Sequence, residues 1–257
     1  MTGEVLVRRD QDVVTVTLSH PGKRNAITYA MYEAMERTWD ALEADGSVRA
    51  VVLRGADGAF AGGTDIRHLA DIGDGERGVV YEAMIARGQR GLLRLRVPVV
   101  AVVDGACVGG GLVLAALSDL VLCTPGSRFG SPIAQTLGNT LSATSLARLH
   151  ALLGRRLTSE ILMTGRLLSA EEALAAGFVN AVLPTEQLEQ RLQELLAAVR
   201  RCAPLSLWSF KELERRVDEV HAAVETADVY RRVYGSRDFS EGVESFLAKR
   251  PARFQGR

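Results

Sequence analysis

Short apolar runs that suit β-strands alternate with longer runs of helical periodicity in the first half of the chain, and this alternation restricts the fold most strongly. Ala50–Arg54, Pro98–Val103 and Leu120–Cys123 are dominated by Val, Leu and Ala, as in strands that are buried on both faces. Helical spacing of apolar residues precedes two of them, at Thr28–Asp45 and from about Glu76 to Leu95. Because strands joined through helices pair in parallel, the sequence predicts an α/β fold with a largely parallel sheet.

The two ends of the chain follow different patterns. Val5–Arg9 and Val13–Leu18 alternate apolar and polar residues around a short polar turn, which predicts a β-hairpin. From Ser142 onward helical segments dominate, near Ser142–Leu153, Ser159–Met163, Ala170–Ala176, Glu186–Arg201 and Leu205–Val233. This region is too helical to extend the sheet, so we predict a core over residues 1–195 and a helical C-terminal portion over residues 196–257.

The composition is that of a globular protein whose partner is a small molecule. A chain of 257 residues, 47% of them hydrophobic, can bury a sizeable core. Thirty-one basic residues balance thirty-one acidic ones without a dense basic block, so the charge pattern of a nucleic-acid binder is missing. Cys107, Cys123 and Cys202 are an odd number at wide spacing, which indicates buried thiols in a reducing compartment rather than disulfides or metal ligands. No run reaches about 18 apolar residues, so we expect no membrane span, no signal peptide and a cytoplasmic location.

Two Gly-rich loops each follow a predicted strand and enter a helix, at Ala59–Asp65 and Asp104–Gly111. The first N–H groups of a helix have no partner within the helix and favour negative charge, so two such loops that converge can form an oxyanion hole. The alternative is that the glycines only supply tight turns and close helix packing. Neither loop has the spacing of a dinucleotide fingerprint, and Leu112 and Val113 stand where a P-loop needs Lys and Ser or Thr.

A set of motifs that spans nearly the whole chain resembles the crotonase, or enoyl-CoA hydratase/isomerase, superfamily and keeps the order of that family. The motifs are Pro21–Ile27, Gly58–Ile66, Val99–Gly105 running into Gly109–Gly111, Ser118–Asp119, Phe129–Gly130, Thr164–Arg166, Ser169–Leu174, Gly177–Asn180 and Glu241–Pro251. The resemblance implies a crotonase-like spiral of ββα units, with the helical C-terminal portion used in trimerisation. It also implies binding of acyl-CoA thioesters by a homotrimer or a dimer of trimers, with coenzyme A as part of the substrate and no separate cofactor.

The same resemblance implies roles for individual residues. In the family, backbone N–H groups at the positions of Thr64 and Gly110 bind the thioester oxygen, which requires no particular side chain. Positions implied to bind the substrate are Arg24, Ala26, Ala61, Gly62, Asp65, Ile66, Arg67, Val113, Ile133, Phe246 and Lys249. For Arg24 and Lys249 solvated surface charge is the alternative. Asp65 is better explained as the cap of the helix that begins there, and Asp119 as a structural residue.

The two glutamates that the hydratases of this family use are missing, because Val113 and Ile133 stand at their positions. The whole stretch Leu120–Ser159 contains no Asp or Glu. Its polar side chains around Phe129–Ser142 can orient water or substrate, but none titrates near neutral pH. The acid or base must therefore come from elsewhere, and the double-bond isomerases of the family also need the second glutamate.

The nearest source of a titrating group is Ile66–Glu82, which family members place over the acyl pocket. We choose His68 as the acid/base candidate because its ordinary pKa lies near neutrality. Asp71, Asp74, Glu76, Tyr81 and Glu82 are alternatives, and each is also typical of a polar residue on a mobile lid. His20, His150 and His221 lack supporting context and are interpreted as structural or surface residues.

These observations favour an acyl-CoA enzyme of the hydratase/isomerase type, of the lyase or isomerase class, with a backbone oxyanion hole and non-standard acid/base groups. Two alternatives stay open, a decarboxylase or thioester hydrolase of the same superfamily and a non-catalytic acyl-CoA-binding protein. A role in RNA binding is the weakest alternative, because the scattered basic residues offer no track for phosphates.

Overall fold

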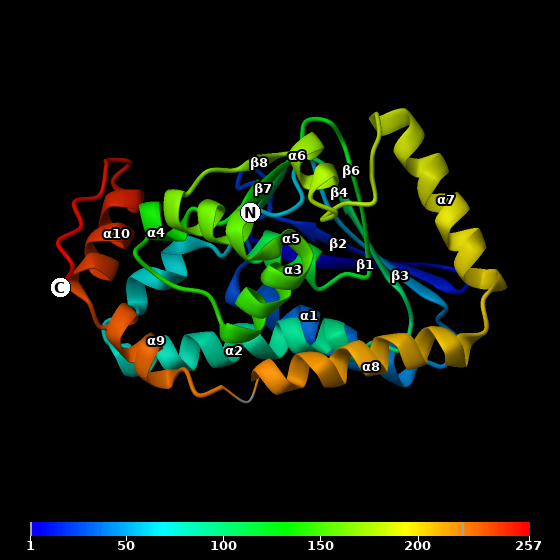
Figure 1. Cartoon of the computed structure of the whole chain (residues 1–257), viewed down its shortest axis with the longest axis horizontal. Helices are drawn as coiled ribbons and strands as arrows, with labels where there is room; N and C mark the ends of the chain where they lie inside the picture. The colour runs from blue at the N-terminus through cyan, green and yellow to red at the C-terminus, as the bar shows by residue number, and fades with distance from the viewer. Residues whose placement is uncertain (1, 223) are drawn as a thin grey trace.

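The computed structural model describes residues 2–222 and 224–257, and within them the principal sheet has six strands. In spatial order these are β1 (Glu4–Asp10), β2 (Val13–Ser19), β3 (Ala50–Gly55), β4 (Val99–Val103), β6 (Leu120–Cys123) and β9 (Ala181–Val182). β1 pairs antiparallel with β2, and every later pairing is parallel (Figure 1). The predicted hairpin and parallel sheet are confirmed. The prediction that the region after Ser142 adds no strand is wrong, because β9 pairs with β6 at the edge.

A second, smaller sheet was not predicted from the sequence. Its strands are β5 (Ala106–Val108), β7 (Arg128–Gly130) and β8 (Leu168–Ser169). An isolated bridge between Ala61 and Cys107 joins the first Gly-rich loop to β5, and another pairs Ile27 with Thr64. These pairings bring the two Gly-rich loops side by side.

The central strands β3, β4 and β6 are buried on both faces, which explains why they are largely apolar, whereas β1 at the edge is mostly exposed and carries charged residues. One face packs against α1 (Tyr29–Ala44), which contributes Met31, Met35 and Trp39 to the larger core. The other face is covered by α7 (Thr185–Arg201) through an apolar stripe of Leu188, Leu192, Leu196 and Val199 (Figure 1).

Several helices begin at side-chain caps that can be read in the sequence. Thr28 Oγ1 accepts the N–H of Met31 at the start of α1, at 3.2 Å. Ser142 caps α5 (Ala143–Thr164), and Ser169 opens a capping box at α6 (Ala170–Ala175). Gly154 breaks α5 with φ 72° and ψ 154°, so the two predicted segments Ser142–Leu153 and Ser159–Met163 lie on either side of a kink.

Four helical elements lie near the Gly-rich loops. These are η1 (Ile66–Asp71), α2 (Gly75–Arg94), α3 (Gly110–Ala116) and α4 (Ile133–Thr136). The C-terminal portion consists of α8 (Pro204–Ala222), α9 (Ala227–Tyr234) and α10 (Arg237–Leu247), so the predicted segment Leu205–Val233 contains two helices. The division at residue 195 falls inside α7 and stays a prediction. None of the helices in the described part of the chain has the length and apolar character needed to cross a membrane.

α9 packs against α2 at unusually close range. A Cβ atom at Gly75 would lie 2.3 Å from the carbonyl oxygen of Arg231, and one at Gly78 would lie 2.3 Å from the Cβ of Tyr234. The two glycines are three residues apart and face the same side of α2. Their missing side chains let Tyr234 reach across the helix, while α10 packs on η1 and α4 (Figure 1).

Candidate active site

Two backbone N–H groups lie next to each other where the Gly-rich loops meet. Thr64 follows Gly63, which adopts φ +100°, and Gly110 is the first residue of α3. A Cβ atom built on Gly110 would lie 3.9 Å from the Thr64 nitrogen, so the two backbones are close together. Over the described residues, neither of these N–H groups has a hydrogen-bond partner. Both donors are thus available to one acceptor atom.

The residues around these donors are held by hydrogen bonds. The N–H of Asp65 donates to the carbonyl of Ile27 at 2.8 Å, and the N–H of Ile27 donates to the carbonyl of Gly63 at 2.7 Å. On the other loop the N–H of Gly109 donates to the carbonyl of Gly130 at 2.9 Å. The positions of the two free donors are therefore set before any ligand binds, which is the condition for electrostatic stabilisation of a developing negative charge.

Asn25 holds the chain that leads into the first Gly-rich loop through three hydrogen bonds. Its Nδ2 donates to the carbonyls of Ala56 and Ala59, each at 2.7 Å, and its Oδ1 accepts the N–H of His20 at 2.9 Å. These bonds hold Asn25 at φ 53°, a conformation that Asn tolerates better than most residues. The His20 ring lies 2.7 Å from the carbonyl of Ala26, which fits the structural role expected of this histidine.

A cavity of about 160 Å³ adjoins the two donors. Its wall includes Thr64, Gly110, Val113 and Ile133, so the two apolar residues that we expect at the glutamate positions of the family both line the cavity. An engineered cavity of about 150 Å³ in another protein holds benzene, so this one has room for a short acyl group.

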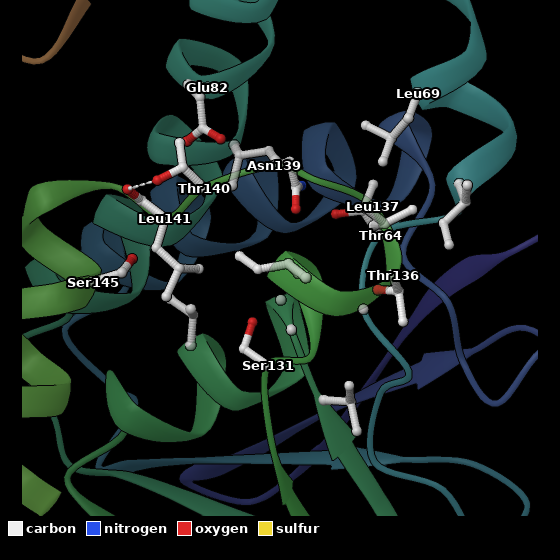
Figure 2. A pocket seen from close by; sticks show the side chains of 18 of the residues that line it. Thr64, Leu69, Glu82, Ser131, Thr136, Leu137, Asn139, Thr140, Leu141 and Ser145 are labelled. Carbon is white, nitrogen blue, oxygen red and sulfur yellow. Dashed lines mark hydrogen bonds between the residues drawn. The ribbon is translucent and has the colours of Figure 1, made fainter. Parts of the chain in front are cut away.

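Glu82 of α2 supplies the carboxyl group in the cavity wall. Its side chain lies at the top of the cavity beside Thr140 (Figure 2). Burial raises the pKa of Glu82 to about 7, and the Tyr234 hydroxyl, which donates a hydrogen bond to Oε1, opposes that rise. Glu82 is only 8% exposed. It can therefore take up or release a proton near neutral pH, as a catalytic acid or base must.

Three buried tyrosines lie near this carboxyl or the Gly-rich loops, since Tyr234 bonds to Glu82, Tyr81 packs edge-on against Tyr234, and Tyr32 contacts Thr64. Burial raises the pKa of Tyr32, Tyr81 and Tyr234, so all three phenols stay protonated at neutral pH. The Tyr32 hydroxyl and Thr64 Oγ1 are 2.9 Å apart. The negative charge of Glu82 adds to the rise of the pKa of Tyr32 and Tyr81, which puts the carboxylate within electrostatic reach of the Thr64 loop.

His68, the candidate chosen from the sequence, lies outside the cavity lining. Its ring stacks on Tyr29 with centroids 4.3 Å apart and an interplanar angle of 21°. This placement does not support His68 as the acid or base. Among the alternatives, Tyr81 and Glu82 line the cavity, whereas Asp74 caps α2 and Glu76 pairs with Arg231.

A signal in the sequence could have singled out Glu82. It shares one face of α2 with Ile85, Gln89 and Leu92, which are three, seven and ten residues further along, and all four are buried. An acidic side chain on the buried face of an amphipathic helix has a perturbed pKa, and such groups concentrate at functional sites.

Asp65 caps η1, as expected. Its carboxylate accepts the N–H of Arg67 at 3.1 Å and forms an ion pair with the Arg67 guanidinium. These interactions with Arg67 hold the pKa of Asp65 below its usual range, against the effect of burial. Asp65 and Arg67 thus satisfy each other beside the site.

The remaining predicted residues divide by location. Gly62, Ile66 and Phe246 line the cavity, and Ala61 is buried and does not line it. Ala26 is half-buried, and Arg24 and Lys249 are exposed and lie outside the cavity lining. Contacts of these residues with coenzyme A stay predictions.

Other singled-out residues belong to the scaffold. Asp119 accepts the N–H of Val99 at 2.7 Å and pairs with Lys211, which fits a structural role. His150 is half-buried on α5, and the side chain of His221 lies outside the described part of the chain. Within residues 2–222 and 224–257 we find no cluster of three His, Cys, Asp or Glu that could hold a metal ion.

Known proteins resemble this chain over nearly its whole length. A family model described as enoyl-CoA hydratase/isomerase matches residues 8–257. The chain is 30% identical over 259 residues to 2,3-dehydroadipyl-CoA hydratase of Escherichia coli (strain K12), with 99% of each covered. An enoyl-CoA hydratase/carnithine racemase structure from Magnetospirillum magneticum aligns with a TM-score of 0.80 at 29% identity, over 100% of this chain and 97% of that one. A methylmalonyl-CoA decarboxylase in complex with 2-nitronate-propionyl-CoA aligns with a TM-score of 0.89 at 25% identity, over 99% of each chain.

These likenesses and the fold define an α/β protein with the crotonase fold. The chain belongs to the enoyl-CoA hydratase/isomerase family. The resemblance drawn from the sequence motifs is thereby confirmed.

Proposed function

We propose that this protein is an acyl-CoA thioester enzyme that stabilises a thioester enolate between the N–H groups of Thr64 and Gly110, with Glu82 as its acid/base group. The observation that carries the proposal is that two backbone donors without a partner among the described residues, and one buried carboxyl group with a pKa near 7, adjoin the same small cavity. His68, chosen from the sequence, gives way to Glu82 because His68 does not line that cavity.

The chemical step follows from these groups. The Glu82 carboxylate takes a proton from the acyl chain, and the electron pair of the broken C–H bond moves onto the thioester oxygen. The two N–H groups bind that oxygen as its negative charge develops, and protonated Glu82 then returns a proton to carbon. When the proton on Glu82 exchanges with water before it is returned, return to the same carbon replaces hydrogen by solvent hydrogen, and return to a different carbon of an unsaturated chain moves the double bond.

Hydrogen exchange tests this step without knowledge of the natural substrate. Butyryl-CoA and crotonyl-CoA are incubated with the protein in D₂O, and deuterium in the acyl chain is followed by mass spectrometry. We expect incorporation with the wild type and a loss of at least about 100-fold in Glu82→Gln, because general acid–base help contributes about 10² to 10⁴. Absence of exchange with tight thioester binding would contradict the role of Glu82 as base, and would favour either the non-catalytic acyl-CoA-binding alternative or a reaction that needs no base.

A substitution pair at residue 110 tests the oxyanion hole. Gly110→Pro removes the N–H at the first position of α3, where proline is compatible with a helix, and should lower exchange by about 10² to 10³. Gly110→Ala keeps the N–H and is the matched control, since its Cβ meets the same Tyr32 hydroxyl at 2.8 Å. Equal exchange rates in the two variants would contradict the assignment of the Gly110 donor.

A second candidate is decarboxylation, favoured by the structural likeness to a methylmalonyl-CoA decarboxylase and by the apolar wall at Val113 and Ile133. In that reaction the bond between the α-carbon and a carboxylate breaks, carbon dioxide leaves, and the electron pair forms the same enolate. No base is needed, so Glu82→Gln should retain release of carbon dioxide from methylmalonyl-CoA. Loss of that release in Glu82→Gln, or none in the wild type, would count against this candidate.

A further inference from the structure

Two polar side-chain atoms in the cavity wall are buried and, in the described part of the chain, have no hydrogen-bond partner. They are Ser131 Oγ and Asn139 Oδ1. Ser131 is completely buried, with 0% of its surface exposed. Buried polar atoms almost always have a hydrogen-bond partner in folded proteins. Two buried atoms without one in the same cavity therefore indicate that a bound ligand supplies their hydrogen-bond partners.

The directions of the two side chains fit this interpretation. Figure 2 shows the Ser131 hydroxyl and the Asn139 amide pointing toward the middle of the cavity from opposite sides. Two other hydroxyls of the same wall, those of Thr136 and Ser142, are already paired within the protein. Thr136 Oγ1 donates to the carbonyl of Pro132 at 2.8 Å, and Ser142 Oγ donates to Ser145 Oγ at 2.9 Å.

The chemistry of the two atoms selects the group they can bind. An amide oxygen only accepts hydrogen bonds, so the ligand must donate to Asn139, whereas the Ser131 hydroxyl can donate or accept. Asn139 Oδ1 is buried without a partner in the described part of the chain, and Figure 2 shows it directed into the cavity.

We propose that Ser131 and Asn139 form a specificity subsite for a hydroxyl group on the acyl chain, so that the protein prefers a short hydroxyacyl-CoA thioester to its unsubstituted analogue. A hydroxyl donates to Asn139 Oδ1 and accepts from Ser131, whereas a carboxylate has no hydrogen to donate and a methyl group satisfies neither atom. The inference rests on the proposed function, because it requires the acyl group to enter this cavity. The cavity of about 160 Å³ suits a chain of about four carbons.

Binding measurements test the subsite. The dissociation constants of butyryl-CoA and of (R)- and (S)-3-hydroxybutyryl-CoA are measured by isothermal titration calorimetry, and chromatography checks that each thioester is intact afterwards. A thioester that is converted is titrated against Glu82→Gln instead. We expect the wild type to bind one hydroxylated enantiomer about 10- to 100-fold more tightly than butyryl-CoA, the effect of two added hydrogen bonds.

Two variants and a control test whether Ser131 and Asn139 cause the preference for the hydroxylated thioester. Ser131→Ala and the near-isosteric Asn139→Leu should each lower the ratio of affinities by about threefold or more, and butyryl-CoA should bind them at least as tightly as it binds the wild type. Thr136→Val lies in the same wall but loses a hydroxyl that is already paired, so its ratio should stay unchanged.

The possible results separate this inference from the proposed function. Equal affinity of the wild type for all three thioesters would show that the two atoms hold only water, and would overturn the subsite alone. A hydroxyl preference that survives in both Ser131→Ala and Asn139→Leu would also overturn it. Failure of every thioester to bind would overturn both the subsite and the proposed function.

Discussion

At the scale of single residues, Glu82 is the group on which the proposed chemistry depends. A base must be ionised, and burial holds the pKa of Glu82 at about 7, so the exchange rate should rise with pH and level off above about pH 7. Tyr234→Phe removes a hydrogen bond that stabilises the carboxylate, and should shift the midpoint of the pH–rate profile upward. His68→Gln is the control. A shift in His68→Gln with none in Tyr234→Phe would contradict the assignment of Glu82.

The same carboxyl makes stability depend on pH. Because its pKa is about 7 in the folded state and near 4.5 in the unfolded state, the folded protein binds more protons between these values. The free energy of unfolding should therefore fall as pH rises from about 4.5 to 7, by up to about 3 kcal/mol from this group. Denaturant unfolding of the wild type and Glu82→Gln at pH 5 and 7.5 checks this, and parallel curves for the two proteins would contradict it.

The absence of carboxylates at Val113 and Ile133 also predicts a weak reaction. Hydration of crotonyl-CoA needs one group that deprotonates water and a proton source for the α-carbon, each worth about 10² to 10⁴. Among the described residues the cavity wall has a single carboxyl, Glu82, where the hydratases of this family have two glutamates. The rate of crotonyl-CoA hydration, measured by the loss of absorbance of the enoyl thioester, should therefore be several orders of magnitude lower than in relatives with both glutamates. Hydration of crotonyl-CoA at a rate that is ordinary for the family would contradict this prediction and show that other groups do the work of the two glutamates.

At the scale of elements, the contact of α2 with α9 delivers Tyr234 to Glu82. In Gly78→Ala the new Cβ would meet the Tyr234 Cβ at 2.3 Å, which neither helix can accommodate without moving. We expect a loss of about 1–3 kcal/mol of unfolding free energy, as for other overpacked sites, and an upward shift of the pH–rate midpoint. Thermal unfolding and the pH profile measure the two effects.

Gly88→Ala is the control for that prediction. Gly88 lies on the same helix, but its new Cβ would come only within 3.3 Å of Tyr32, a contact that small adjustments relieve. Alanine also favours a helix over glycine, so this variant should be close to the wild type in stability. Equal destabilisation of the two variants would show that the close contact at Gly78 is not the cause.

At the scale of the whole molecule, α8 carries an apolar stripe that the single chain leaves exposed. Phe210, Leu213 and Val217 are 60–63% exposed and lie three and four residues apart, on one face of the helix. Large exposed apolar patches mark sites of association. The stripe supports the prediction of a homotrimer or a dimer of trimers.

Sedimentation equilibrium tests the assembly. The wild type should have three or six times the chain mass of 27.7 kDa at micromolar concentration. Leu213→Glu should weaken the assembly by placing a charge in the stripe, whereas Met163→Glu, on the exposed surface of α5, should leave it intact. A wild-type monomer near 28 kDa would contradict the prediction.

The sequence by itself determined the family, the parallel sheet and the two Gly-rich loops, because strand and helix periodicity, capping residues and loop glycines act over short stretches of chain. The starts of α1 at Thr28 and of η1 at Asp65 are local in this sense. The short strands β5, β7 and β8 were missed, since two or three residues carry no periodicity and their pairing joins distant segments.

Only the tertiary structure decided which side chains share the cavity. In the sequence Glu82 and His68 are both polar residues of the same segment. The fold places Glu82 in the wall of the cavity, whereas it stacks His68 on Tyr29. The pKa of Glu82 depends on burial by α2 and on Tyr234, which lies 152 residues away in the chain. Ser131 and Asn139 are likewise unremarkable polar residues until packing removes them from water without a partner. Burial is a property of the whole packed chain, so no local pattern could reveal it.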